Sequence, residues 1–336
     1  MIKEAIKQLV AGKSLATEQA EQVMEEIMGG EATPAQFGAF VTALRLNGET
    51  VDELIGMARI MRARSIKVNA GQPAIDTCGT GGDAAGTFNI STGAALVAAG
   101  AGLRVAKHGN RAMSSRCGSA DVLEALGVKI DCDAAGIEYC IRETGIGFMF
   151  APLFHPAMKY AAAPRREIGI RTVFNLIGPL TNPAGAQAQV IGVAEGAIAE
   201  KIALTLKGLG CRHALVVHGE RGIDEIAIDG KTHICELRDG EIKSYDVSPA
   251  DFGLTEAGAD SMKGGDAAEN AEILRNILSG KTGGAQRDVV LMNAAAALLA
   301  GDEVSDLKRG FELAAEVIED GQAAAKLEKL VEVSNG

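Results

Sequence analysis

The sequence is poor in aromatic residues and lacks both tryptophan and a long apolar run. Aromatic residues make up 4% of the 336 residues. The core must therefore consist of Ala, Leu, Ile and Val, as is typical of helices packed on a parallel sheet. No stretch reaches the roughly 18 apolar residues of a membrane span, and the N-terminal segment MIKEAIKQLVAGKSLA has no signal-peptide core. We therefore expect a cytoplasmic protein that has no membrane partner.

The six cysteines form no CxxC pair, which argues against a zinc site or a thioredoxin motif. They are scattered as Cys78, Cys117, Cys132, Cys140, Cys211 and Cys235, as expected of reduced thiols. Basic residues are also in deficit, since 33 Lys and Arg face 44 Asp and Glu, for a net charge of -11. This balance argues against a nucleic-acid partner, which would require a basic face.

The chain divides by pattern into a helical part and an α/β part. Residues 1–65 predict only helices, with capping boxes at Thr33–Gln36 and Thr50–Glu53 and a helix from Thr17 to Gly29. From residue 66 onward strands, loops and helices alternate. We expect an α/β fold with a small N-terminal helical domain (1–65), on which part of 155–185 packs. The larger domain (66–336) has a mostly parallel central sheet flanked by helices.

Within the larger domain the pattern predicts individual elements. Strands are expected to end at Ile75-Asp76 and to cover 103–106, 128–130, 146–150, 189–193 and 214–217. Helices are expected over 94–101, from Ser119 to Gly127, after Asp133, and over 197–209. Residues 155–186 predict two helices and a long ordered loop. A hairpin over 231–247 turns at Asp239-Gly240, and the chain is helical from Gly264.

Two glycine-rich loops follow strands and suggest a phosphate site. The first is DTCGTGGD at 76–83, and the second is KHGNR at 107–111, running on to Ser114-Ser115. Between them, NISTG at 89–93 opens a helix. Glycine allows backbone N–H groups to approach an anion closely, and a helix N-terminus favours negative charge. A single GTGGD is more often a tight turn, but a second loop with Lys, His and Arg favours a ligand site.

Two further groups of charged residues have open interpretations. Asp224-Glu225 follows a strand and could anchor Mg²⁺ together with substrate phosphates, although Asp-Glu pairs are common. Arg165, Arg166 and Arg171 lie in a basic segment. On charge alone, the simpler interpretation of these arginines is a solvated or acid-paired helix face.

Two common nucleotide-binding motifs fit poorly. Gly280-Lys281-Thr282 lacks the P-loop glycine five positions earlier, because residue 275 is Arg. Residues 79–84 match GxGxxA after a strand, as in a Rossmann fingerprint. The acidic residue expected about twenty positions later is missing, since Lys107-His108 ends the next strand.

The motifs resemble those of the anthranilate phosphoribosyltransferase family. The resemblance rests on GTGGD, NISTG, KHGNRAMSS and GSAD, and continues through HPAMK, RTVFNLIGPLTNPA, VVHGERGIDEI and QRDVVLMNAAAAL. It spans essentially the whole chain. It implies a helical domain that forms a homodimer, and transfer of phosphoribosyl from phosphoribosyl diphosphate to anthranilate, with Mg²⁺, in tryptophan biosynthesis. Any glutamine-amidotransferase partner, such as an anthranilate synthase component, would be a separate chain.

The resemblance also implies site residues. Phosphoribosyl diphosphate would contact Gly79, Gly82, Asp83, Thr87, Asn89, Ile90, Ser91, Thr92, Lys107, His108, Gly109, Asn110, Arg111, Ala112, Met113, Ser114, Ser115 and Ser119. Anthranilate would contact Gly79, Asn110 and Arg165, with His108 nearby. Ser91, Asp224 and Glu225 would hold the metal. The family usually has Pro-Val before the arginine aligned with Arg165, whereas this chain has Ala163-Pro164, so Arg166 and Arg171 are alternatives.

The chemistry implied by the resemblance needs positioning more than a base, because an aromatic amine is already unprotonated at neutral pH. We therefore expect no general base and a positioning role for His108. Three alternatives remain: a pyrimidine nucleoside phosphorylase-like enzyme, a phosphoribosyltransferase with another aromatic amine acceptor, and a non-catalytic nucleotide binder. The KHGNR loop argues against the first, and the Asp224-Glu225 pair argues against the last.

Overall fold

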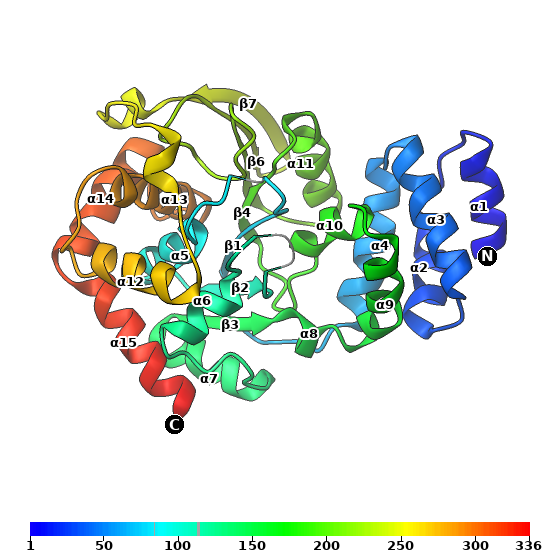
Figure 1. Cartoon of the computed structure of the whole chain (residues 1–336), viewed down its shortest axis with the longest axis horizontal. Helices are drawn as coiled ribbons and strands as arrows, with labels where there is room; N and C mark the ends of the chain where they lie inside the picture. The colour runs from blue at the N-terminus through cyan, green and yellow to red at the C-terminus, as the bar shows by residue number, and fades with distance from the viewer. Residues whose placement is uncertain (84, 113–114) are drawn as a thin grey trace.

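A computed structural model of the chain describes residues 1–83, 85–112 and 115–336. The N-terminal helices lie to one side of the molecule, to the right in Figure 1, and the sheet with its remaining helices forms the larger part. The N-terminal helices are α1 (Ile2–Val10), α2 (Thr17–Gly29), α3 (Pro34–Asn47) and α4 (Val51–Arg64). Helix α9 (Lys159–Ile168), from the 155–185 segment, packs on α2 and α3.

The predicted helix signals of this part are confirmed. Thr33 Oγ1 accepts from the Gln36 amide at 3.2 Å, and the Gln36 side chain accepts from the Thr33 amide at 2.9 Å. Thr50 and Glu53 form the same reciprocal pair. Helix α2 begins at Thr17 and ends before Gly30, whose φ of 78° suits glycine. Local capping therefore determines these boundaries.

One seven-stranded sheet organises the larger part, in the order β3-β2-β1-β4-β5-β6-β7. The first five of these strands run parallel, and β6 and β7 form the predicted antiparallel hairpin. The strands are β1 (Ile75–Gly79), β2 (Val105–Gly109), β3 (Ile146–Phe150), β4 (Ala188–Gly192), β5 (His213–Gly219), β6 (Thr232–Arg238) and β7 (Glu241–Val247). The predicted fold class, a mostly parallel α/β sheet with a helical domain, is confirmed.

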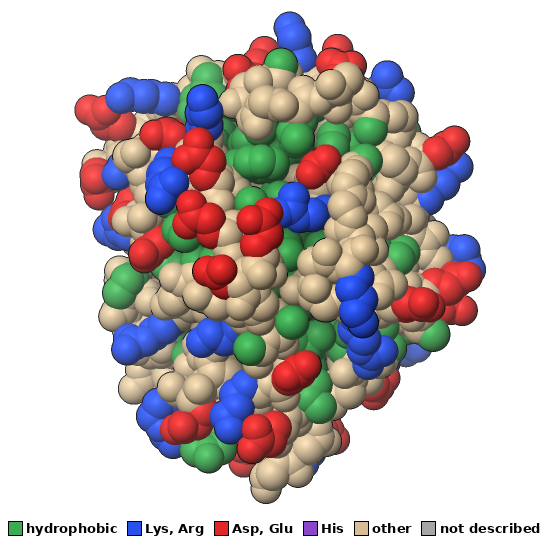
Figure 2. Space-filling view, turned by 90° about the vertical axis from the view of Figure 1, so that its left-hand side faces the viewer, with side chains coloured by type: hydrophobic (Ala, Val, Ile, Leu, Met, Phe, Trp, Pro, Cys, Tyr) green, Lys and Arg blue, Asp and Glu red, His purple; other side chains and the backbone are tan. Residues whose placement is uncertain are grey.

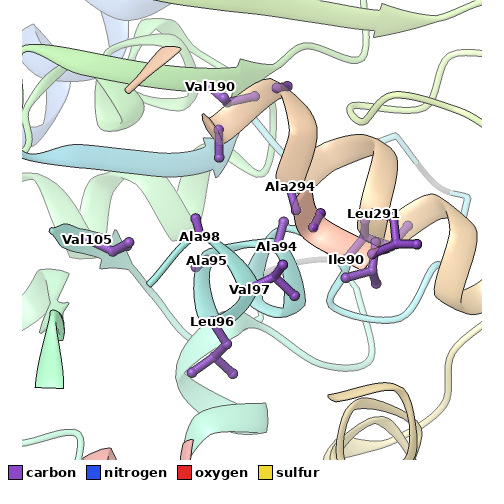
Figure 3. Packing of buried hydrophobic residues seen from close by; sticks show 14 of the residues in the cluster. Ile90, Ala94, Ala95, Leu96, Val97, Ala98, Val105, Val190, Leu291 and Ala294 are labelled. Carbon is purple, nitrogen blue, oxygen red and sulfur yellow. The ribbon is translucent and has the colours of Figure 1, made fainter. Parts of the chain in front are cut away.

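Alternate residues of the central strands face opposite layers, as the two-residue period of a strand requires. Val190 and Leu215 join a core with α5 (Ile90–Gly100) and α13 (Ala285–Ala300), whereas Ile191 and Val216 join a core with α11 (Ala199–Gly208) and the N-terminal helices. Figure 3 shows α5 packed through small residues against Leu291 and Ala294 of α13. These small side chains replace the missing aromatic residues by close approach of helix and sheet.

Further helices complete the layers. They are α6 (Ser119–Ala125), α7 (Ala134–Thr144), α8 (Ala151–Phe154), α10 (Val173–Ile177), α12 (Ala267–Leu278), α14 (Leu307–Glu319) and α15 (Gln322–Asn335). On the face opposite the helical domain, acidic and basic side chains are interspersed (Figure 2). Within the described ranges, no helix combines the length and apolarity needed to cross a bilayer.

Three predicted strand positions were wrong. Ile75 begins β1 rather than ending it, and β2 runs two to three residues later than predicted. Both strands continue because β4 and β3 pair with them, from Ile75↔Ala188 to Gly79↔Gly192 and up to Gly109↔Phe150. Residues 128–130 are not a strand. Their amides bond instead to the end of α6 and to α15: the Val128 amide donates to Leu123 O, and the Lys129 amide to Ser334 Oγ.

Candidate functional site

The first glycine loop leaves the carboxyl end of β1 directly beside the Asp224-Glu225 segment. A Cβ on Gly79 would lie 2.4 Å from Asp224 Oδ2, and one on its strand partner Gly192 would lie 1.6 Å from Asp224 O. The Gly81 amide donates to Asp224 Oδ2 at 2.8 Å. Glycine is therefore required at both strand ends because a loop from another part of the chain passes there.

The N-terminus of α5 lies on the other side of this carboxylate pair. The helix begins at Ile90 after its N-cap Asn89. The Ser91 amide donates to Glu225 Oε1 at 3.2 Å. The structure thus brings together the predicted first-loop residues, the helix start with Ser91 and Thr92, and Asp224 and Glu225, so that the three predicted metal ligands lie in one place. Thr87 lies farther along, in an isolated bridge with Lys263.

The carboxylates at this edge lack counter-charges close enough to offset their burial. Burial raises the pKa of Asp224 to about 7, and the Asp83 carboxylate adds to the rise. Burial, followed by the repulsion from Asp224, raises the pKa of Glu225 well above its ordinary value. Crowded carboxylates are typical of a site that a divalent cation completes. Among the described residues, no group of three or more His, Cys, Asp or Glu side chains could hold a metal by itself. The two carboxylates fit Mg²⁺, because this ion usually takes one or two protein carboxylates together with waters and substrate phosphates.

A buried polar network that the sequence analysis missed lies beneath the two loops. Lys107 Nζ donates to Thr77 O at 2.5 Å. Asp76 accepts from the His108 amide at 3.1 Å and from Asn182 Nδ2 at 2.7 Å, and the same Asn182 amide group donates to Ala106 O at 2.8 Å. Burial raises the pKa of Asp76 to about 6, although Lys107 opposes the shift. The network ties β1, β2 and the Asn182 loop together.

The second glycine loop follows β2 and turns onto α6. Asp121 fixes its base, because Oδ2 accepts from the amides of Ala112 and Gly118, both at 2.9 Å. Ser119 Oγ donates to Asn110 O at 3.4 Å. Arg111 Nη1 is 2.9 Å from Asp121 and 2.8 Å from Glu124, so its charge is paired on α6. The predicted Met113 and Ser114 lie outside the described residues, and Ser115 is exposed.

The two loops border a cavity of about 520 Å³ between the sheet edge and the helical domain. Its lining combines Gly79, His108, Gly109 and Asn110 from the loops, His155, Arg165 and Arg166 from the 155–185 segment, and Met61 from α4, together with Phe174, Asn175 and Pro179. The lining is mainly apolar, and it places a few polar groups opposite one another. This pattern is typical of a small-molecule site.

Three of the cavity residues carry the most informative polar groups. The Arg165 guanidinium lies 5.2 Å from the ring centroid of Phe174 and is half-buried. Arg165 forms no ion pair within the described ranges and is only partly solvated, so the simpler interpretation of a solvated or acid-paired helix face does not describe it. His108 and His155 have ring centroids 5.0 Å apart, and within the described part of the chain their Nε2 atoms have no hydrogen-bond partner. His155 was not singled out from the sequence, although it stands in the HPAMK motif.

Buried imidazoles of this kind remain neutral. Burial lowers the pKa of His108 to about 3 and that of His155 to about 4. Arg171, the second alternative to Arg165, does not line this cavity. Its guanidinium instead lies against Gly82 and donates to Thr80 O at 3.2 Å. Arg165 and Arg166 are thus the two arginines that line the cavity.

Two family models match the chain. Residues 3–65 match "Glycosyl transferase family, helical bundle domain", and residues 71–324 match "Glycosyl transferase family, a/b domain". The chain is 57% identical to an anthranilate phosphoribosyltransferase of Roseiflexus castenholzii, with 99% of this chain and 98% of that protein covered. It is also 57% identical to the protein of the same name from Dehalococcoides mccartyi, with 99% and 98% covered.

Solved structures agree in fold. The anthranilate phosphoribosyltransferase of Thermus thermophilus superposes with a TM-score of 0.93 at 44% identity, with 99% of each chain covered. The enzyme of Saccharomyces cerevisiae in complex with PRPP (phosphoribosyl diphosphate) and Mg gives a TM-score of 0.91 at 27% identity, with 99% of this chain and 98% of that chain covered.

Proposed function

The chain belongs to the anthranilate phosphoribosyltransferase family, and from this premise we propose that it transfers phosphoribosyl from PRPP to the amine of anthranilate. The products are N-(5-phosphoribosyl)anthranilate and diphosphate, in a step of tryptophan biosynthesis. The observation that carries the proposal is the position of the unneutralised Asp224-Glu225 pair. It lies between a glycine loop and a helix start, directly beside the cavity that contains Arg165.

PRPP would lie along the sheet edge between the two glycine loops. The amides at the start of α5 would face the phosphates, and buried Lys107 adds positive charge beneath. The residues proposed for PRPP from the sequence remain the proposed set, Gly79 to Thr92 and Lys107 to Ser119 as named above. Arg111 would have to leave Asp121 and Glu124 to reach the ligand.

Mg²⁺ would be held by Ser91, Asp224 and Glu225 together with phosphate oxygens. When bound, it neutralises the charge that develops on the departing diphosphate. The chain itself orients these ligands, since the Gly81 and Ser91 amides each fix one carboxylate. Lys107, within electrostatic reach of Glu225, supplies a second positive charge to the same edge.

Anthranilate would occupy the cavity, with its ring on the apolar lining and its carboxylate at Arg165. A guanidinium can bind a carboxylate through two parallel hydrogen bonds. Asn110 and Gly79 would direct the amine toward the anomeric carbon. Neutral His108 and His155 would orient the acceptor without adding charge. Catalysis would then depend on alignment and on leaving-group electrostatics, with no strong base.

We also propose a homodimer formed through the helical domain. Val10 at the end of α1 is 73% exposed, and Leu46 near the end of α3 is 83% exposed. Asn47 Nδ2 donates to Leu9 O at 2.9 Å, so the ends of α1 and α3 that carry these two exposed apolar residues lie next to each other. Leu46→Glu should convert a dimer to a monomer in light scattering, whereas a single mass for both proteins would contradict the proposal.

The test of function is an anthranilate fluorescence assay with PRPP and Mg²⁺, each omitted in turn. We expect loss of the anthranilate signal only when all three are present. If another aromatic amine were consumed in place of anthranilate, that amine would be the acceptor. Phosphate-dependent cleavage of a pyrimidine nucleoside would instead support the phosphorylase alternative.

A further inference from the structure

A second, much smaller cavity lies beside the first glycine loop. Its lining includes Arg45 of α3, Thr80 of the loop, Arg171 and Thr172 before α10, and Glu195. Its volume is about 10 Å³, which is enough for about one water molecule. This space fits a single atom or one water molecule better than a phosphate or an organic carboxylate.

Two buried hydroxyl groups in this lining point to an occupant. Thr80 is 8% exposed and Thr172 is 4% exposed. In the ranges that the structure describes, neither Oγ1 atom has a hydrogen-bond partner. A buried hydroxyl group without a hydrogen-bond partner destabilises the folded state. Two such groups on one small cavity therefore favour a ligand that accepts hydrogen bonds from both.

The charge of the lining favours an anion. Arg45 Nη2 is 3.6 Å from Glu195 Oε1, so one guanidinium is partly balanced. Arg171 donates to Thr80 O at 3.2 Å and forms no ion pair among the described residues. Two guanidinium groups thus face one carboxylate. Arg45 and Glu195 are 41% and 56% exposed, so solvent screens their charges, whereas Arg171 is half-buried. Water would satisfy the hydroxyl groups but would leave the charge of Arg171 without a counter-ion among the described residues.

We propose that the cavity is a binding site for a monatomic monovalent anion of the size of chloride. Arg171 and the hydroxyls of Thr80 and Thr172 hold the ion, and Arg45 contributes charge from the helical domain. Because Thr80 belongs to the glycine loop and Arg45 to α3, the bound ion links the loop to the helical domain. Its effect on catalysis rests on the proposed function, since the loop positions PRPP.

The direct test is crystallographic and does not depend on activity. Crystals grown in bromide should show an anomalous peak between Arg171 and Thr172 in the wild-type protein and in Thr172→Ser. The peak should disappear in Thr172→Val, which keeps the shape of the side chain but loses the hydroxyl. Arg59→Gln, a surface arginine of the helical domain paired with Glu21, serves as the control and should retain it. Density for water alone in bromide would overturn the proposal.

The kinetic test compares chloride with gluconate at equal ionic strength. We expect the KM for PRPP to be several-fold lower in chloride for the wild-type protein and Thr172→Ser, and equal in the two salts for Thr172→Val. If chloride raised the KM equally in all variants, it would compete at the diphosphate site, and the link to the loop would be refuted. If no transferase activity existed, the proposed function would fail while the bromide result still decided the ion site.

Discussion

The two ends of strand β5 make a useful comparison because each places His, Asp or Glu side chains in a buried setting. At its start, His213 Nδ1 lies 2.9 Å from Asp302 and Nε2 lies 3.0 Å from Glu236, with Arg212 and Arg238 also at Asp302. The hydrogen bond from His213 is the main reason that the pKa of Glu236 is lowered. The side chains named here all have partners, and the cluster joins β5, β6 and the segment that follows α13.

Beyond the other end of β5 the charges are not balanced. Asp224 and Glu225 crowd Asp83, and the pKa values of Asp224 and Glu225 are raised. Across the cavity His108 and His155 are buried without bonds to Nε2 in the described part of the chain. Both ends contain acidic and histidine side chains, so they differ in whether these side chains have charged or hydrogen-bonded partners. The paired end stabilises the fold, and the unpaired end is ready for ligands.

The largest expected effect tests the unpaired end. Asp224→Asn should lower kcat at saturating Mg²⁺ by about 10²–10³-fold, because it removes charge that would hold the leaving-group cation. It should leave the free energy of unfolding unchanged or raise it, since it removes repulsion with Asp83. Steady-state kinetics and urea unfolding measure the two effects. An unfolding midpoint that fell as steeply as kcat would show that Asp224 is mainly structural.

The matched test of the paired end is His213→Leu. Removing the imidazole leaves Asp302 and Glu236 facing each other without their shared partner. We expect the free energy of unfolding to fall by about 3 kcal/mol. This loss is at the low end for a broken buried ion pair, because both carboxylates are partly exposed. The kcat of the folded protein should stay within about twofold. A selective loss of activity at unchanged stability would contradict the assignment of this cluster to the fold.

A smaller effect separates the arginines of the cavity. Arg165→Lys should raise the KM for anthranilate by about 10–30-fold, because an ammonium group cannot form the two parallel bonds to a carboxylate. The KM for PRPP should change little. Arg166→Lys is the control on the same helix, and Arg166 is exposed. If Arg166→Lys had the larger effect on anthranilate, the carboxylate partner would be Arg166.

The smallest effect concerns pH. The pKa of His155 is lowered to about 4 from 6.5, so the unfolded chain binds more protons between those values. The stabilising contribution is therefore complete above pH 6.5 and is lost as the pH falls toward 4. When the pH falls from 7 to 5, the free energy of unfolding should decrease in both proteins. The decrease should be about 1–2 kcal/mol smaller in His155→Gln than in the wild-type protein. Parallel losses in the two proteins would show that His155 is already accessible to solvent protons.

Much of the architecture could be predicted because its signals are local. The boxes at Thr33 and Thr50, the Asp133 cap and the Asp239-Gly240 turn each determine a boundary through neighbouring residues. The ends of β1 and β2 could not be predicted, because pairing with distant strands decides them. The division at residue 65 stays a prediction.

The site divides in the same way. Sequence motifs indicated both glycine loops and the Asp224-Glu225 pair. The Asp76–Asn182 bond joins residues 106 positions apart, and no local pattern reveals it. Likewise, the position of Arg171 against Gly82, rather than in the large cavity, depends on how the 155–185 segment folds back.

The large cavity takes its two sides from different parts of the chain. Gly79, Gly109 and Asn110 come from the sheet edge, whereas Met61 and Arg165 come from the helical side and the 155–185 segment. On the proposed assignment, Arg165 binds the carboxylate of the acceptor and the glycine loops bind PRPP, so mutations that alter which amine is accepted can accumulate on the side of Met61 and Arg165. The preference for the acceptor can then change during evolution while the residues for phosphoribosyl transfer stay the same. A mutant library restricted to the helical side is the appropriate way to change the acceptor.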